Sequence, residues 1–188
     1  SEMCIRDRNK SPDFYFFNHS IPAEVCSVLI KYHIDNFSKE EKEFCKDIIL
    51  EFASLPLRTN YQYQISDGVE SAISVLPILF KEFPKERETI KTILLLTLFD
   101  SYPIGIDAEF ADFPTRAVKE LFTISFEDAQ SLLLGYLYLK PKYEILRGKL
   151  RQKNYARGIY QVRENELIEA FIEKYEKDLE KVVSNNIS

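Results

Sequence analysis

The chain has 188 residues, of which 45% are hydrophobic and 29% charged, and its net charge is −5. This composition indicates one folded domain with a substantial core and excludes a disordered chain. The negative charge offers no overall attraction for nucleic acid. Three cysteines without a CxxC pair do not form a disulfide framework. Cys26 and Cys45 each lie on an apolar helical face, and we expect them to be buried thiols in a reducing compartment. No signal peptide is visible, so we expect a cytoplasmic location.

The first eight residues, SEMCIRDR, differ in kind from the rest of the chain. They resemble a translated sequencing-adapter artefact of metagenomic gene calling, and residues 1–8 are therefore treated as non-native. We expect residues 9–188 to form a single α-helical repeat domain that is a fragment of a longer protein.

Helical periodicity predicts two helices in the first third of the chain, over 22–36 and 38–54. Pro22 suits the first position of the first helix. Ser38 and Glu41 form a capping box at the start of the second. The apolar face of the first helix is predicted to contain Val25, Val28, Leu29 and Tyr32. The second helix is predicted to bury Phe44, Cys45, Ile48, Ile49 and Phe52.

The strongest pattern lies between residues 67 and 99. Asp67 and Glu70 predict a capped helix start. Pro84 suits the first position of a second helix, whose body over 90–99 is apolar almost all round and is therefore expected to be covered on several sides. That run is far shorter than the roughly 18 apolar residues of a membrane span. The buried face of the first helix is predicted to be Val69, Ala72, Ile73, Leu76, Leu79, Phe80 and Phe83.

Pro77 lies inside the first of these two helices, where a proline costs about 3 kcal/mol because it removes a hydrogen bond and crowds the preceding turn. A kinked helix followed by a straight apolar one is typical of HEAT repeats. The stretch LPILFKEFPKERETIKTILLLTLF resembles a HEAT unit, with Pro77 at the kink and Ile90-Lys91 where the family often has Val-Arg. The alternative is that Pro77 ends one helix and starts another.

Four further helices are predicted in the second half of the chain: one from Pro114, one capped by Ser125 and Asp128, one from Pro141, and one over 164–183. The helix from Pro114 is predicted to bury Ala117, Val118, Leu121 and Phe122, and the helix capped by Ser125 is predicted to bury Phe126, Ala129, Leu133, Tyr136 and Leu137. The last helix is predicted to bury Ile168, Phe171, Ile172, Tyr175, Leu179 and Val182.

Helix pairs thus begin near residues 22, 67 and 114, a spacing of about 45 that lies in the range of HEAT-type units. The predicted fold class is all-α, with antiparallel helix pairs stacked as a HEAT-like solenoid segment. A closed helical bundle would use the same pattern and is the alternative architecture.

The chain contains no recognisable arrangement of catalytic residues. The segment 100–113 carries Asp100, Asp107, Glu109 and Asp112, but their spacing fits no EF-hand, and a docked loop is the preferred interpretation. His19 and His33 do not pair with a cysteine at metal-binding spacing, and no phosphate-binding glycine motif is present. We expect no catalytic, cofactor-binding or metal site, and no enzymatic activity, in this fragment.

The strongest local charge lies between residues 140 and 163, where eight basic side chains face Glu144 alone, a net charge of +7. Tyrosines are interleaved with them, as in proteins that bind single-stranded nucleic acid. The alternatives are a solvated surface or a patch that meets an acidic protein partner. The basic residues are Lys140, Lys142, Arg147, Lys149, Arg151, Lys153, Arg157 and Arg163.

The run SDGVESAISVLPILFKEFPKERETIKTILLLTLFDSYPIG resembles the α-helical repeat regions of large bacterial STAND-type NTPases, including antiviral ones. The resemblance covers about a third of the chain, and the NTPase signatures themselves are absent from it. It implies a non-catalytic scaffold or sensor segment of a large ATP-binding protein, which binds a protein partner or flanking domains of its own chain. The alternative function is an all-α nucleic-acid-binding module that uses segment 140–163. Neither reading involves a cofactor, a metal or a membrane.

Overall fold

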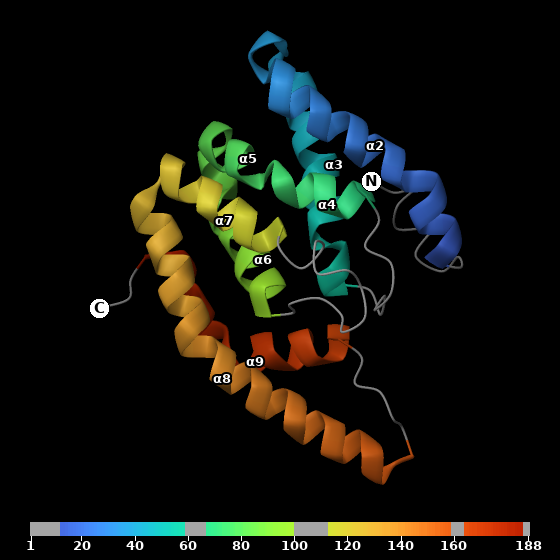
Figure 1. The fold of residues 1–188 in the computed structure, drawn as a ribbon, viewed down its shortest axis with the longest axis vertical. Coiled ribbons are helices and arrows are strands. Elements are labelled where there is room, and N and C mark those ends of the chain that lie inside the picture. The colour runs from blue at the N-terminus through green and yellow to red at the C-terminus, as the bar shows by residue number, and fades with distance from the viewer. Residues whose placement is uncertain (1–11, 59–66, 100–112, 159–163, 186–188) are drawn as a thin grey trace.

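The computed structural model describes residues 12–58, 67–99, 113–158 and 164–185, and these residues form helices without any strand, which confirms the all-α class (Figure 1). Residues 1–8 and the acidic segment 100–112 lie outside the described residues. The α-helices are α2 (Pro12–His33), α3 (Lys39–Arg58), α4 (Asp67–Ser74), α5 (Leu76–Glu82), α6 (Arg87–Phe99), α7 (Phe113–Ile124), α8 (Phe126–Ala156) and α9 (Glu164–Val183), with short 3₁₀ helices η2 (Ile34–Asn36) and η3 (Pro84–Glu86).

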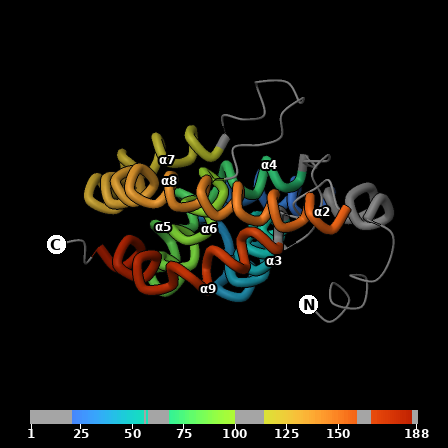
Figure 2. The backbone as a smooth tube through the Cα atoms, turned by 90° about the horizontal axis from the view of Figure 1, so that it is seen from below, coloured from blue at the N-terminus to red at the C-terminus, as the bar shows by residue number. Residues whose placement is uncertain are grey.

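The helices pack around α6. It contacts α3, α5, α7, α8 and α9, and this explains why its residues from Ile90 to Phe99 are apolar on nearly every side. Figure 2 shows α4 and α7 on one side of the molecule and α3 and α9 on the other. Within the described part of the chain, none of the helices combines the length and apolar composition needed to cross a membrane.

The stacked solenoid stays a prediction. The contacts of α2 with α4 and of α4 with α7 fit a row of stacked helices, and so do those of α3 with α6 and of α6 with α8. Helix α9, however, lies across α3 and α6 as well as α8, so it closes over the second row instead of extending it.

The predicted buried faces of the central stretch and of α7 are confirmed except at Phe83 and Phe122, which are half-buried. Val69, Leu76 and Leu94 are completely or almost completely inaccessible to solvent, as are Ala117 and Leu121. The predicted capping box also forms: the Ser38 amide donates to Glu41 Oε2 at 2.8 Å, and the Glu41 amide donates to Ser38 Oγ at 3.2 Å. Helix α4 begins at Asp67 as expected.

At Pro77 the structure has a helix break, so the predicted continuous kinked helix is wrong and the alternative is right. Helix α4 ends at Ser74, and Pro77 lies in the first turn of α5. Val75 between them has φ −99° and ψ 0°, outside the geometry of a regular helix. The physical reason is that Pro77 cannot donate to the carbonyl four residues earlier, and the chain uses a tighter turn there, from the Val75 amide to the Ala72 carbonyl at 3.3 Å.

The predicted first helix differs from α2 of the structure both in where it begins and in which side is buried. Helix α2 begins at Pro12 and continues through Pro22. The predicted face of Val25, Val28 and Tyr32 is exposed, with Leu29 half-buried. The buried face of α2 is instead Ala23, Cys26, Ser27 and Ile30. Smaller side chains face α3 and α4 because they allow a closer approach between the helices. In α3, Phe44 is likewise exposed, while Cys45, Ile49 and Phe52 are buried as predicted.

The predicted helix boundary at Pro141 is wrong. Helix α8 is a single helix of 31 residues that contains Pro141, where two helices were expected. Pro141 cannot donate to the Leu137 carbonyl, but Leu137 is 67% exposed, so that carbonyl is on the side that water can reach. On the opposite side, the Tyr143 ring stacks on Phe99 with centroids 5.3 Å apart and anchors the helix.

The predicted face of α8 is also wrong in part. Ala129 is buried as expected and Tyr136 is half-buried, but Phe126, Leu133 and Leu137 are exposed. The buried side is formed by Ala129, Ser131, Leu132, Gly135, Leu139 and Tyr143.

Gly135 permits the close crossing of α8 and α9. A Cβ atom at Gly135 would lie 2.4 Å from Val182 Cγ1, whereas a Cβ at Gly148, further along α8, would meet nothing within 4 Å. Ser131 Oγ donates to the Val182 carbonyl at 2.7 Å and ties the two helices at the same level.

This difference predicts opposite effects for the same substitution. Gly135→Ala is expected to lower the free energy of unfolding by about 1–2 kcal/mol, because α9 must move to accept the methyl group. Gly148→Ala is expected to raise it by about 0.5–1 kcal/mol, because alanine favours the helix and has room there. Urea unfolding followed by circular dichroism measures both. Val182→Ala in the Gly135→Ala background should recover part of the loss, and equal effects at the two glycines would contradict the close crossing.

Candidate interaction surface on the outer helices

The outward side of α8 carries an exposed row of apolar side chains, here named the α8 stripe, formed by Leu134, Leu137, Tyr138, Pro141 and Ile145. The four non-proline members are between 53% and 67% exposed. Their spacing of three and four residues places them on one side of a helix. A contiguous apolar surface of this kind marks an interaction site more often than a solvated face.

A second exposed apolar row, the α2 stripe, lies on the outward side of α2. Its members are Ile21, Val25, Val28 and Tyr32, between 50% and 65% exposed. Helix α2 packs on α3 and α4, and α8 packs on α6, α7 and α9, so the two stripes lie at opposite ends of the helix assembly (Figure 1). Both ends of the assembly thus present apolar helix surfaces to solvent.

Three of the predicted basic residues contact other groups of the protein, two of them on another helix. Lys140 donates to the Phe99 carbonyl at 2.6 Å, at the end of α6, and pairs with Glu144 at 3.0 Å. Lys142 donates to the Tyr138 hydroxyl at 2.7 Å and lies 3.5 Å from Asp178 on α9. Arg147 lies 4.0 Å from Glu144. Lys140 and Lys142 therefore link α8 to α6 and to α9, whereas the contact of Arg147 lies within α8 itself.

Four others are exposed, namely Lys149, Arg151 and Lys153 on the last turns of α8 and Arg157 directly after its end. Lys149 and Lys153 are four residues apart and share a side, but Arg151 lies on a different side of the helix, so the four do not form one patch. Arg163 and Tyr160 lie outside the described residues. Of the interleaved tyrosines, Tyr155 is exposed, whereas Tyr143 is completely buried and cannot stack on a base.

A buried ion pair that the sequence did not predict joins α6 to α8 and to the end of α9. Lys91 is 1% exposed, and its Nζ donates to Asp128 Oδ1 at 3.0 Å and to Asn185 Oδ1 at 2.5 Å. Asn185 Nδ2 donates to Asp128 Oδ1 at 2.7 Å, and Ser125 Oγ donates to Asp128 Oδ2. Ser125 stands at the N-cap of α8 as predicted, but its hydroxyl bonds Asp128 and makes no bond to a backbone amide.

The pKa values of this pair follow from its surroundings. Burial lowers the pKa of Lys91, although the hydrogen bond and charge of Asp128 oppose the change. Burial alone would raise the pKa of Asp128, but hydrogen bonds from Ser125, Asn185 and Lys91 outweigh it and hold that pKa below its ordinary value. The effect of the bonds prevails at Asp128 because this carboxylate is less deeply buried and accepts three donors. Lys91 is 1% exposed and is therefore not accessible to a substrate.

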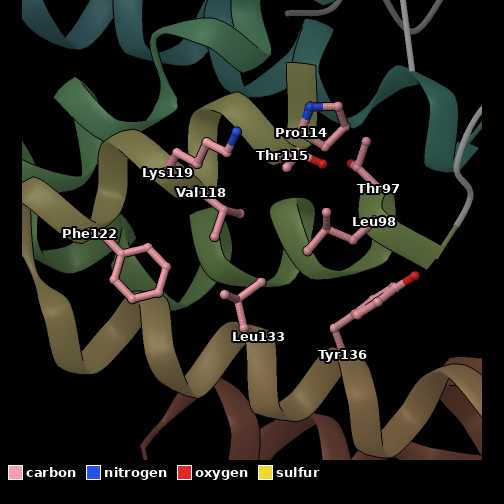
Figure 3. A pocket seen from close by; sticks show the side chains of 9 residues that line it. All are labelled: Thr97, Leu98, Pro114, Thr115, Val118, Lys119, Phe122, Leu133 and Tyr136. Atoms are coloured by element: carbon pink, nitrogen blue, oxygen red, sulfur yellow. The ribbon is translucent and has the colours of Figure 1, made fainter. Parts of the chain in front are cut away.

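A mainly apolar cavity of about 320 Å³ lies between α6, α7 and α8 (Figure 3). Leu98, Val118, Phe122, Leu133 and Tyr136 point toward it from the three helices. Residues 100–112, which join two of its walls, lie outside the described residues, and we therefore assign this cavity no ligand.

Metal and thiol chemistry find no support in the described part of the chain. No group of three histidine, cysteine or acidic side chains is placed there to hold a metal ion, and the acidic segment 100–112 lies outside it. Cys26 and Cys45 are free and buried, as predicted for two of the three cysteines. Burial, reinforced by the neighbouring Cys45, raises the pKa of the Cys26 thiol to about 12, so this thiol stays protonated and unreactive.

Comparison with known proteins adds no family: no family model matches the chain, and no curated protein shows significant similarity to it. The interpretation of function therefore depends on the surfaces described above.

Proposed function

We propose that this chain is a non-catalytic helical-repeat segment, a scaffold or sensor that binds protein partners through its outer helices. The observation that carries the proposal is the pair of exposed apolar stripes on α2 and α8. Each stripe would remove apolar area from water by packing on another helix, which is worth about 25 cal/mol per Å². The described helices of this chain likewise pack on one another.

We further propose that the chain is part of a longer protein, and that this longer protein is a large cytoplasmic ATP-binding protein of the STAND type, a group that includes antiviral proteins. Its support is the resemblance of the central stretch to their helical arrays. The test is the unbroken reading frame upstream of Asn9 in the source DNA. A phosphate-binding motif G-x-x-x-x-G-K-[ST] is expected there. A long upstream stretch without that motif would remove the STAND assignment.

Nucleic-acid binding is the second candidate, and the exposed Lys149, Arg151, Lys153 and Arg157 favour it. Its support is reduced because Lys140 and Lys142 bond to groups on α6 and α9 and Tyr143 is buried.

A salt titration distinguishes the two functions. If the chain is a protein-binding scaffold, it should not bind labelled single-stranded DNA or RNA oligomers in a salt-dependent way. Fluorescence anisotropy at low salt should then show either no binding or binding whose affinity does not fall steeply as the salt concentration rises. Binding that falls with salt, and that Lys149→Glu together with Lys153→Glu abolishes, would support the nucleic-acid function instead. Gln152→Ala on the same turns serves as the control for changes in the helix itself.

A further inference from the structure

We propose that the side of α3, α6 and α8 that α9 covers, here named the α9-binding surface, is a site for an amphipathic helix, which α9 of the same chain occupies in this structure and which a helix of a protein partner can occupy instead. This surface differs from the α2 and α8 stripes, so the inference goes beyond the proposed function and does not depend on it. Three observations carry it: the position of α9, the side chains that receive it, and the way in which it is held.

Helix α9 lies on the row formed by α3, α6 and α8, not within it. It contacts all three of these helices, and it shares with α3 the side of the molecule opposite α4 and α7 (Figure 2). Helical-repeat proteins use the open side of such rows to bind partners, and an amphipathic helix laid on an apolar surface is a recurrent form of recognition. Helix α9 has this form, because Leu167, Phe171 and Val182 are buried while Glu169 and Glu173 are exposed.

Two features of the α9-binding surface fit particular apolar side chains of α9. The Phe171 ring meets the rings of Phe99 on α6 and Tyr143 on α8 edge to face, with centroids 5.2 Å and 5.3 Å away. Val182 packs against Gly135 of α8 so closely that a Cβ atom at Gly135 would overlap its methyl groups. The surface therefore accepts an aromatic ring at one level and a small branched side chain at another.

The third feature is polar and lies at the end of α9. Asn185 accepts a hydrogen bond from the buried ammonium group of Lys91 and donates one to Asp128. An amide can do both at once, whereas a carboxylate in its place would meet Asp128 with like charge. Phe171, Val182 and Asn185 have the spacing i, i+11, i+14, which is about 20 Å along a helix. We therefore expect a partner helix with an aromatic, a small branched and an amide side chain at this spacing.

Two features weaken the hold on α9. Tyr175 has φ −120° and ψ 24°, so α9 consists of two shorter segments on either side of a kink, and short helices have little stability of their own. Burial lowers the pKa of Lys91, so release of α9 would return water to this ammonium group, which keeps Asp128 as its partner. A partner nevertheless competes with α9 at an effective concentration on the order of millimolar, because α9 belongs to the same chain. The unmodified chain should therefore bind a partner helix weakly, and a chain with a loosened α9 should bind it more tightly.

A peptide copy of α9 is the probe for this competition. Fluorescence anisotropy measures the binding of a labelled peptide of residues 164–185 to the full chain. Asn185→Lys in the chain places a second ammonium group beside Lys91, and we expect this chain to bind the unmodified peptide about tenfold more tightly than the unmodified chain does. Ser184→Lys is the matched control, because Ser184 is exposed and its hydroxyl donates to the Glu180 carbonyl within α9. It makes the same change in charge and should leave peptide binding as in the unmodified chain.

Variants of the peptide test the three features separately. Phe171→Ala, Val182→Phe and Asn185→Asp in the peptide should each weaken binding to the Asn185→Lys chain about tenfold or more, because each removes or blocks one of the three contacts. Glu173→Gln is the control, since Glu173 is exposed on the opposite side of α9 and this peptide should bind as the unmodified one does.

Hydrogen exchange of the unmodified chain gives an independent measurement. The amides of α9 should exchange at least about tenfold faster than those of α6, through an opening that leaves α6 protected. Amides of α9 that are protected as strongly as those of α6 would overturn the inference, because α9 would then open only when the whole chain unfolds.

The binding experiment can overturn the inference in three further ways. The Asn185→Lys chain could lose its cooperative melt, which would make α9 inseparable from the core. It could fold and bind the peptide no better than the Ser184→Lys chain. All peptides could bind equally, which would exclude recognition by the three features. The proposed function fails on different grounds, namely an upstream reading frame without the NTPase motif or oligonucleotide binding that is lost with Lys149 and Lys153.

Discussion

Asp128→Ala is expected to lower the free energy of unfolding by about 3 kcal/mol, because it leaves the ammonium group of Lys91 buried without its carboxylate. Lys91 is 1% exposed and lies 3.0 Å from Asp128 Oδ1, and Asn185 alone cannot balance its charge. Urea unfolding at pH 7 measures the loss. Asp47→Ala is the matched control. It removes a surface carboxylate 3.4 Å from Lys46, which keeps Glu43 and Glu86, so a change under about 0.5 kcal/mol is expected.

The double variant Lys91→Met, Asp128→Leu separates the charge from the position. Replacing both members of a buried ion pair by apolar side chains of similar size is often neutral or stabilising. We therefore expect most of the stability lost in Asp128→Ala to return. A double variant as unstable as the single one would show that packing at Asp128, and not the unpaired charge of Lys91, is responsible.

Acidification should reproduce part of the Asp128→Ala effect. The pKa of Asp128 in the folded state lies below its ordinary value of 3.8, so the folded state resists protonation of this carboxylate. Its contribution to stability is therefore complete above about pH 4 and is lost as the pH falls through the folded-state pKa. The difference in unfolding free energy between the unmodified chain and Asp128→Asn should narrow over that range and stay constant between pH 5 and 8.

Leu94→Asp is expected to prevent folding altogether. Leu94 is completely buried in α6, and α6 is contacted by five other helices, so a carboxylate there would be cut off from water. The cost exceeds the 4–5 kcal/mol that marks exceptional substitutions and approaches the whole stability of a typical domain, roughly 5–15 kcal/mol. The circular dichroism spectrum at 20 °C should lose most of its helical signal.

Leu98→Asp, on the same helix, gives a graded comparison. Leu98 is half-buried at the wall of the cavity between α6, α7 and α8, where a carboxylate can reach solvent. We expect this variant to fold with a reduced but cooperative melt. Leu94→Met changes shape while keeping volume and should cost less than 1.5 kcal/mol. A cooperative, undiminished melt of Leu94→Asp would show that α6 does not hold the core together.

The burial of the central stretch could be predicted well from the sequence, because its helices are apolar either on one side only or on nearly all sides. Such patterns leave no doubt about which side of each helix faces the core. Residues 67–99 bury the expected side chains except Phe83, which is half-buried. Helix α9 begins and ends where the periodicity placed it and buries Ile168, Phe171, Leu179 and Val182 as predicted, but Ile172 is exposed and Tyr175 is half-buried. The outer helices were harder for a physical reason. Both α2 and α8 have apolar residues on two sides, and periodicity cannot tell which side faces inward. The inward side proved to be the one with small residues, such as Ala23 in α2 and Gly135 in α8.

Two other features depend on tertiary structure and leave only a weak trace in the sequence. The continuity of α8 through Pro141 needs an anchor on the far side, which the stacking of Tyr143 on Phe99 provides. The Lys91–Asp128–Asn185 network joins residues up to 94 positions apart. One local indication of this network is present in the sequence, namely that Lys91 is the only charged residue in the helix body over 90–99. A lysine buried in such a helix needs a partner of opposite charge.

The most direct test of the central claim, that the exposed stripes on α2 and α8 are protein-binding surfaces, is thiol labelling of those stripes in the isolated chain and in the longer protein that we propose contains it. Tyr32→Cys and Leu137→Cys, each in a Cys4→Ser background, place one thiol in each stripe, and Cys26 and Cys45 are buried and should not react. The account predicts fast alkylation of both stripe thiols in the isolated chain and slow alkylation in the longer protein, whereas Lys177→Cys on the exposed side of α9 should react equally fast in both. Equal alkylation rates of the stripe thiols in the two proteins would contradict the claim.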